Sequence, residues 1–217
     1  MAPPSEPAGA PVAPRWLEWT RRLQSVAQAG LTHAQNPYDL ERYRDVRRVA
    51  AEIAAAGTAG DVDAILAFFA SQRGYPTPKV DVRAAAIVED QILLVKERDD
   101  GGWALPGGWA DVGESAAEAA VRETREEAGV EVRPEKVIAL YERERRGHPP
   151  HPEFSYKIFF ACRVCGVPEP RGGRETLGAA FFAPGTLPPL SAARVTSQEI
   201  AVAFAHHRDP GLPTEFD

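Results

Sequence analysis

Residues 108–130 read GWADVGESAAEAAVRETREEAGV, and this stretch decides the fold class of the chain. Within it, Glu123, Glu126 and Glu127 stand at positions i, i+3 and i+4, so they share one face of a helix predicted over residues 115–128. Three carboxylates at this spacing repel each other, and a divalent cation would turn that repulsion into attraction. Because oxygen-only ligands suit hard cations, the spacing predicts a Mg²⁺ site, with Mn²⁺ as the alternative, and not a zinc site.

The same predicted helix has a second face that can be buried, about 120° from the glutamates at about 100° of turn per residue. Arg122 lies four residues before Glu126 and is placed to pair with a glutamate and orient it. Gly129 supplies the left-handed residue that often ends a helix. The face to be buried contains Ala117, Ala120, Val121, Thr124 and Ala128.

Outside this stretch the hydrophobic pattern changes to that of strands. Residues 79–88 and 91–97 are rich in Val, Ile and Leu, and Glu89-Asp90 between them predicts the turn of a β-hairpin. Strands combined with two helices predict an α/β fold with a mixed sheet packed between helical layers. The other predicted elements are strands at 137–142, 154–164 and 179–182 and a helix at about 197–207.

The first part of the chain is predicted to form a small all-helical unit. Asn36-Pro37 is typical of a capped helix start, and Asp61 can cap a further helix. Gly30 is expected to end the first helix, and Gly57 and Gly60 are expected to close the second. The predicted organisation is a disordered tail at 1–14, the helical unit at 15–73, a proline-containing linker at 74–79, the sheet-containing domain at 80–208 and a C-terminal tail at 209–217.

Composition narrows the functional classes. The net charge of −6 argues against a non-specific nucleic-acid binder, although it does not exclude a local basic groove. No apolar run is long enough to cross a bilayer, and residues 1–14 lack the pattern of a secretory signal. The only two cysteines, Cys162 and Cys165, favour a reducing cytoplasm and are too few for a structural zinc site.

The stretch at residues 108–130 resembles the Nudix box, whose pattern is Gly-x5-Glu-x7-Arg-Glu-U-x-Glu-Glu-x-Gly-U, with U bulky and aliphatic. Thr124 departs from the pattern at the first U, where we expect slightly weaker packing and an intact metal site. The resemblance implies a Nudix-type α/β/α sandwich and a hydrolase in which a metal-activated water attacks one phosphorus of a diphosphate. The matched positions are Gly108, Glu114, Arg122, Glu123, Glu126, Glu127, Gly129 and Val130.

The resemblance also implies roles for these residues. Glu126 and Glu127 would bind the metal ion, Glu123 would assist, and the Gly108 carbonyl would be a further ligand. Glu114 would brace the loop before the helix, and Arg122 would orient a glutamate.

The general base is left open between a box glutamate and a glutamate from a distant loop. Glu175, which follows the Gly172-Gly173 pair, is the candidate for the second possibility. Its alternative is an ordinary exposed loop acid.

Further segments resemble a bacterial Nudix subgroup with a helical N-terminal extension, including NPYDLERY at 36–43 and LPGGWADVGE at 105–114. Members of that subgroup are associated with hydrolysis of CDP-choline to CMP and phosphocholine, and some with ADP-ribose. We therefore expect a Mg²⁺-dependent pyrophosphohydrolase of CDP-choline or a related CDP-alcohol, with ADP-ribose or a nucleotide sugar as the alternative. The candidate substrate-binding residues are Arg83, Arg98 and Lys157 for phosphates, Trp103 and Tyr141 for stacking on a base, and His148 in a loop that either covers the substrate or is a plain connecting turn.

Two other functional classes compete with this hypothesis. Some Nudix-like domains lose catalysis and act as ligand sensors, but such loss would remove box carboxylates, and here all are present. RNA processing is weakened by the acidic net charge without being eliminated. The N-terminal helices, with Trp16, Trp19, Phe68 and Phe69 to bury, predict a homodimer.

Overall fold

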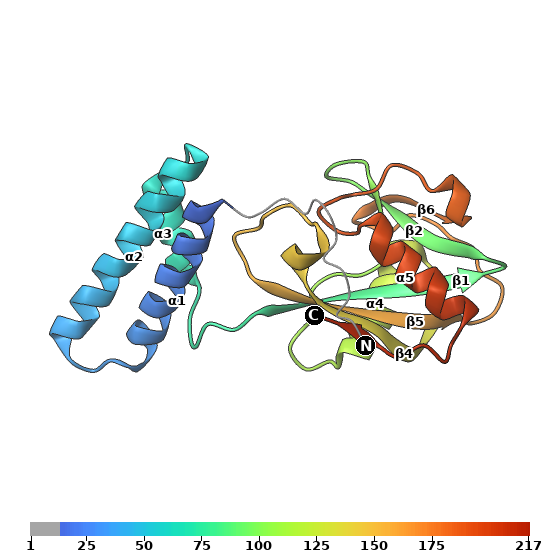
Figure 1. The fold of residues 1–217 in the computed structure, drawn as a ribbon, viewed down its shortest axis with the longest axis horizontal. Coiled ribbons are helices and arrows are strands. Elements are labelled where there is room, and N and C mark those ends of the chain that lie inside the picture. Colours follow the sequence, from blue (N-terminus) through green and yellow to red (C-terminus); the bar gives the residue numbers. More distant parts are fainter. Residues whose placement is uncertain (1–13) are drawn as a thin grey trace, which may run out of the picture. The chain divides into compact units, whose positions relative to one another are not determined.

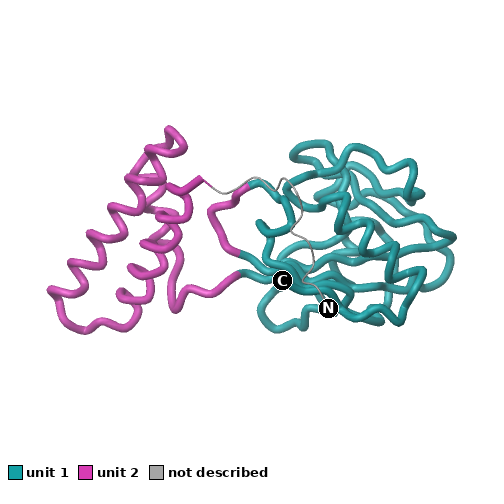
Figure 2. The backbone as a smooth tube through the Cα atoms, in the orientation of Figure 1, with its two compact units in different colours: residues 1–11, 79–149, 155–217 teal, residues 12–78, 150–154 magenta. Residues whose placement is uncertain are grey.

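The computed structural model describes residues 14–217, which form two compact units. Figure 2 colours them separately. Among the described residues, the helical unit contains residues 14–78 and 150–154, and the sheet unit contains residues 79–149 and 155–217. The disordered tail predicted at 1–14 lies, apart from Pro14, outside the described residues.

Three helices make up the helical unit (Figure 1). Asn36 caps the second helix, because its side chain accepts a hydrogen bond from the Tyr38 backbone N–H at 2.9 Å. Asp61 caps the third helix by accepting from the Ala64 N–H at 2.8 Å. None of the helices within residues 14–217 is long and apolar enough to cross a membrane. The bounds are α1 (Arg15–His33), α2 (Pro37–Thr58) and α3 (Val62–Ser71).

Gly30 lies inside α1, which ends at His33, so the prediction that it ends this helix was wrong. The second helix ends at Thr58, between Gly57 and Gly60, as predicted. A Cβ at Gly30 would lie 2.4 Å from the ring of Tyr43, and a Cβ at Gly57 would lie 2.2 Å from the ring of Trp16. Both glycines therefore let an aromatic ring of the facing helix approach the backbone, and close packing of α1 against α2 requires a small residue at each position.

The sheet unit is built on one mixed seven-stranded sheet. Six of its strands follow the order β3-β2-β1-β5-β4-β7, and the seventh, β6, pairs with β2. The central pair, β1 and β5, is parallel, whereas β1–β2 and β4–β5 are antiparallel. The predicted hairpin is confirmed, with Glu89 and Asp90 in its turn at positive φ. The strands are β1 (Lys79–Val88), β2 (Gln91–Glu97), β3 (Trp103–Ala104), β4 (Val132–Glu142), β5 (Ser155–Val164), β6 (Thr176–Phe182) and β7 (Glu215–Phe216).

Two helices cover opposite faces of this sheet, α4 (Ala116–Ala128) and α5 (Ser197–Arg208) (Figure 1). Because side chains alternate along a strand, Val82 and Ala84 of β1 pack on the α4 side, whereas Ala85 packs on the α5 side. The predicted α/β/α sandwich with a mixed sheet is thereby confirmed. Two short 3₁₀ helices, Arg143–Arg146 and Pro184–Thr186, lie in connecting loops.

Two of the predicted boundaries need correction. Lys79, expected in the linker, already begins β1. Residues 209–217 do not form a simple tail, because β7 pairs in parallel with β4, with Ala139 opposite Glu215. The segment 150–154 belongs to the helical unit, where the Arg21 guanidinium donates to the carbonyl of His151.

Candidate active site

The helix α4 has strong local signals at both ends. Ser115 and Glu118 form a reciprocal capping box at its start, and Gly129 takes the left-handed conformation (φ 66°) at its end. Thr124, the departure from the box pattern, is fully buried, and its hydroxyl donates to the Ala120 carbonyl at 2.7 Å. This local bond satisfies the buried hydroxyl, so the substitution leaves no unpaired polar group in the core.

The three glutamates of α4 differ in exposure along one face of the helix. Glu127 is buried, the side chain of Glu123 is 14% exposed and that of Glu126 is 53% exposed. All three line one cavity of about 420 Å³. Arg174 and Glu175, from the loop before β6, line the same cavity. The structure thus brings Glu175, predicted from a distant loop, together with the box glutamates.

Arg122 joins the glutamates to the preceding loop. Its guanidinium binds both carboxylate oxygens of Glu114, at 3.0 and 2.8 Å. Its Nη1 also donates to Glu123 at 2.9 Å and to Glu126 at 3.3 Å. The hydrogen bonds from Arg122 and from the Asp111 N–H lower the pKa of Glu114 to about 2. This fork-to-fork geometry joins the loop that carries Glu114 to the helix that carries Arg122.

Glu127 carries the most perturbed carboxyl group of the cavity. Burial raises its pKa to about 7, although a hydrogen bond from the Gly107 N–H at 2.9 Å and the nearby Arg83 work in the opposite direction. Gly107 itself has φ 147°, and a Cβ there would lie 1.9 Å from the Val82 carbonyl oxygen. Only glycine therefore lets this loop deliver an N–H to the buried carboxylate.

Gly108 lies directly against the acidic face. A Cβ at Gly108 would lie 3.1 Å from Oε1 of Glu123. The Gly108 carbonyl accepts the Val82 N–H at 2.8 Å, which leaves its second lone pair for another partner. The position predicted for a carbonyl ligand is therefore next to the glutamates.

The residue types in the cavity fit a hard divalent cation. All the available ligands are oxygen atoms, and the buried Glu127 lacks a directly bonded cation. Within residues 14–217, however, no three His, Cys, Asp or Glu side chains converge in metal-binding geometry. Arg122 Nη1 instead donates to both Glu123 and Glu126, so a metal ion would compete with this guanidinium for carboxylate oxygens.

Comparison with known proteins agrees with this arrangement. Residues 77–202 match the family described as "NUDIX domain", which is more than half of the chain. The chain belongs to the Nudix family. It is a Nudix hydrolase, and hydrolases of this family generally use a divalent metal ion. Residues 14–69 match a second family, described as "UDP-X-like, N-terminal oligomerisation domain".

Three relatives resemble this Nudix hydrolase over much of its length. The Bacillus subtilis (strain 168) protein named "Putative ADP-ribose pyrophosphatase YjhB" is 41% identical over 95% of this chain and 99% of its own. The crystal structure of an ADP-ribose pyrophosphatase from Streptococcus suis is 39% identical, covers 65% of this chain and all of that chain, and has a TM-score of 0.59. The crystal structure of a UDP-X diphosphatase is 27% identical, covers 94% of this chain and 98% of that chain, and has a TM-score of 0.60.

Several of the residues predicted to bind substrate are buried in the sheet unit, where other protein groups are their partners. Arg83 and Lys157 are buried and both bind Asp81, with the Lys157 Nζ at 3.1 Å from Asp81 Oδ2. Burial opposes the charge of Asp81, but the two cations prevail and lower its pKa. Arg83 also donates to the Leu105 carbonyl at 3.1 Å, which braces the loop that carries Gly107. The structure gives Arg83 and Lys157 interior ion-pair partners in place of a phosphate.

Tyr141 and His148 are also interior residues, so of the two possibilities for the His148 loop, a substrate cover or a plain connecting turn, the structure does not place His148 over the cavity. His148 has no exposed surface, and its Nε2 lies 2.8 Å from Oε1 of the buried Glu199. The Tyr141 hydroxyl donates to Glu215 at 2.7 Å, and burial raises its pKa above its usual range. Neither side chain lines the cavity of the glutamates.

Arg98 and Trp103 lie nearer the surface. The Arg98 guanidinium donates to the carbonyls of Arg174 and Thr176, at 3.4 and 3.3 Å, and so holds the loop that carries Glu175. Trp103 packs edge-on against Phe182, with ring centroids 4.8 Å apart. Sequence reasoning missed Arg174, although its position directly before Glu175 was a usable signal.

Proposed function

We propose that this Nudix hydrolase is a Mg²⁺-dependent pyrophosphohydrolase that cuts the phosphoric anhydride bond of ADP-ribose or a related nucleotide sugar. The observation that carries the proposal is the cavity in which the three box glutamates meet Glu175 and Arg174. A cavity of about 420 Å³ has the size of a small-molecule site. The choice of ADP-ribose is supported by the names of the relatives from B. subtilis and S. suis.

In this proposal Glu123, Glu126, Glu127 and the Gly108 carbonyl hold the Mg²⁺ ion. When bound, the ion supplies charge neutralisation at the phosphate oxygens and lowers the pKa of a coordinated water. The Gly107 N–H keeps the Glu127 carboxylate oriented towards the loop. Arg122 keeps Glu123 in place through its simultaneous bonds to Glu114 and Glu123.

Glu175 and Arg174 complete the proposed reaction centre from the opposite loop. We assign Glu175 as the base that accepts the proton of the attacking water, since it shares the cavity with the metal-binding residues. Arg174 donates to non-bridging phosphate oxygens, for which a guanidinium fork is well suited. Hydrolysis at the diphosphate then separates a nucleoside monophosphate from the second phosphate ester.

CDP-choline stays a second candidate substrate. The match of residues 14–69 to the UDP-X-like N-terminal domain favours testing pyrimidine diphosphates beside ADP-ribose. The test is a panel of ADP-ribose, UDP-glucose and CDP-choline with Mg²⁺ or Mn²⁺, with AMP, UMP and CMP quantified by chromatography. We expect AMP from ADP-ribose at the highest kcat/KM. If all three substrates stay intact with either ion, the proposal is wrong.

We also propose that the chain is a homodimer through its helical unit. That unit matches a family described as an oligomerisation domain, and its Trp19 and Phe68 side chains are exposed in the single chain. Light scattering of the full chain at micromolar concentration should give twice the mass of one chain. A monomeric mass under these conditions would count against the dimer.

A further inference from the structure

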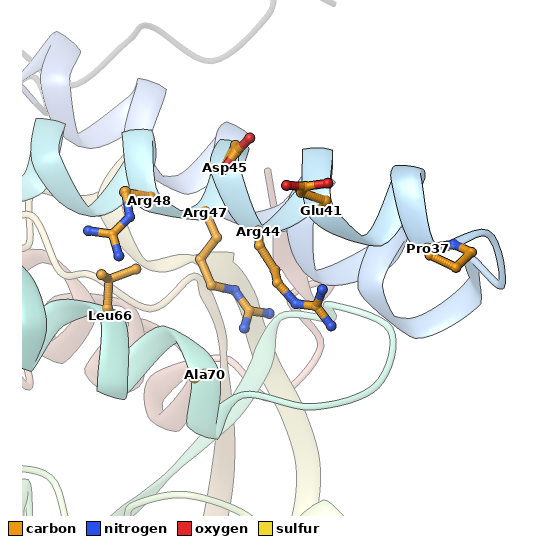
Figure 3. Close-up of a pocket in the computed structure, with 8 residues that line it drawn as sticks. All are labelled: Pro37, Glu41, Arg44, Asp45, Arg47, Arg48, Leu66 and Ala70. Carbon is orange, nitrogen blue, oxygen red and sulfur yellow. The ribbon is translucent and has the colours of Figure 1, made fainter.

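The helical unit has its own pocket, formed between α2 and α3 and far along the sequence from the box glutamates (Figure 3). Its volume is about 560 Å³. Leu66 and Ala70 of α3 form its apolar side. The α2 side is dominated by guanidinium groups, and the α2 residues that line the pocket are Pro37, Glu41, Arg44, Asp45, Arg47 and Arg48.

Arg44, Arg47 and Arg48 stand at i, i+3 and i+4 on α2, and their guanidinium groups make no hydrogen bond or ion pair with any residue in the described part of the chain. Figure 3 shows the guanidinium groups of Arg44 and Arg47 pointing the same way, while the carboxylates of Glu41 and Asp45 point away from them. The available acids therefore do not neutralise the pocket.

Among these three arginines, Arg47 has the least favourable surroundings for a positive charge. Its Nε atom is buried without a hydrogen-bond partner. Burial and then the neighbouring Arg44 lower the pKa of the Arg47 guanidinium. An unpaired buried donor and a like-charge neighbour both destabilise the unliganded helical unit.

We propose that this pocket binds a phosphate-type anion, either inorganic phosphate or the phosphate group of a phosphomonoester. Guanidinium forks suit tetrahedral oxyanions, and a dianion balances the clustered positive charges. The pocket volume leaves room for a small organic group beside the phosphate.

A carboxylate from a second copy of the chain is the competing occupant. A broad acidic surface docking at this rim would approach Glu41 and Asp45 together with the arginines, whereas a small anion reaches the guanidinium groups alone. This difference in repulsion favours a small anion.

Isothermal titration calorimetry of the full chain tests the proposal, with inorganic phosphate and ribose 5-phosphate as the titrants. EDTA and constant ionic strength keep metal chemistry at the box glutamates out of the measurement, so the result does not depend on the proposed hydrolysis. The test variant is Arg47→Gln, and Arg44→Gln replaces it if circular dichroism shows that Arg47→Gln does not fold. The matched control is Arg42→Gln, which removes one positive charge from the same helix at an exposed residue that pairs with Asp39 at 2.9 Å.

We expect saturable binding of at least one anion, weakened about tenfold or more in Arg47→Gln and within twofold of wild type in Arg42→Gln. Tighter binding of ribose 5-phosphate would identify a phosphomonoester as the ligand, and equal binding would identify free phosphate. The proposal is overturned if neither anion binds, or if both variants weaken binding equally, because that indicates only diffuse charge. The proposal is also overturned if the wild-type chain is an oligomer that binds neither anion and Arg47→Gln dissociates it. The guanidinium groups would then bind a second copy of the chain.

Discussion

Two helices of this protein carry like charges at the same spacing, but the charges have opposite sign. Within residues 14–217, hydrogen bonds from neighbouring residues compensate the charges on only one of the two helices. On α4, Glu123, Glu126 and Glu127 occupy i, i+3 and i+4, and on α2 three arginines occupy the same spacing. The α4 acids receive hydrogen bonds from Arg122 and from the Gly107 N–H. The α2 arginines receive no such compensation from the described residues.

The difference shows that like charges at helical spacing are not by themselves a catalytic signal. A structured loop against α4 holds the acids in place, with Gly107 and Gly108 giving close backbone approach. At α2 the arginines face Leu66 and Ala70 of α3, and no hydrogen bond or ion pair from Glu41 or Asp45 holds their guanidinium groups within the described residues. We therefore expect charge changes on α4 to act on catalysis, and charge changes on α2 to act on stability and anion binding.

The largest expected effect is from Glu126→Gln. Removing one charge of the proposed metal site should lower kcat by about 10²- to 10³-fold, since a catalytic metal ion contributes several kcal/mol of transition-state stabilisation. The fold should survive, because the Glu126 side chain is 53% exposed. Steady-state hydrolysis of ADP-ribose with Mg²⁺ measures the loss. As a control, Glu131→Gln makes the same charge change at an exposed residue past the helix and should keep wild-type kcat. Equal activity of Glu126→Gln and the wild type would refute the proposed metal site.

Arg122→Lys should have the next largest effect. Lysine keeps the positive charge but cannot bind both oxygens of Glu114 while also reaching Glu123. Loss of such an orienting contact typically costs about 10- to 100-fold in metal affinity or activity. The apparent Mg²⁺ affinity and kcat report it, and added Mg²⁺ should rescue part of the activity. Arg125→Lys, an exposed change on the same helix, serves as the control, and a matching loss there would show a general helix effect.

Metal binding should depend on pH through Glu127. Burial raises the pKa of its carboxyl to about 7 in the metal-free chain, so below pH 7 a proton competes with the ion. Apparent Mg²⁺ affinity should fall about tenfold per pH unit below 7 and level off above it. The free energy of unfolding of the metal-free chain depends on pH in the opposite sense. The raised pKa of Glu127 contributes its full stabilisation at pH values below the pKa of this carboxyl in the unfolded chain. That stabilisation is lost as the pH rises through about 7. The rise in unfolding temperature on adding Mg²⁺ should therefore be larger at pH 8 than at pH 6, and Glu127→Gln should abolish this difference.

The smallest effect is expected on α2. Arg44→Gln removes a like-charge neighbour of Arg47 and should stabilise the helical unit by about 0.2–0.5 kcal/mol in phosphate-free buffer. Arg42→Gln, which loses the exposed pair with Asp39, should not stabilise it. Chemical denaturation followed by circular dichroism compares the two variants. Destabilisation by Arg44→Gln would mean that this arginine has a structural partner. The charges on α2 would then be compensated by neighbouring groups, as they are on α4.

Local sequence signals predicted most elements of both units. The start of α4 at Ser115 and its end at Gly129, and the caps at Asn36 and Asp61, all follow from the chemistry of a few adjacent residues. Short elements were missed, because the two-residue strand β7 depends on pairing with β4 and not on its own pattern. Gly30 was misread as a helix end, since only the facing helix shows that this glycine admits the ring of Tyr43.

The substrate contacts were the weakest part of the sequence prediction. A charged residue on a strand looks the same in sequence whether it meets a ligand or a buried partner. Lys157 and His148 turned out to have the interior partners Asp81 and Glu199, which are distant in sequence. By contrast, Glu175 was proposed from a loop and does lie at the cavity, although its role as a base is still a proposal.

The sequence by itself determined the acidic helix and the order of the box residues, because the spacing of Glu123, Glu126 and Glu127 is set by the helical period alone. Only the tertiary structure decided which charges are neutralised. Arg122 and Gly107 reach the α4 acids through the packing of a loop on the helix, and the packing of α2 and α3 leaves Arg47 without a partner. The physical reason is that compensation of charge acts over a few ångströms in space, whereas the residues that provide or withhold it are far apart along the chain.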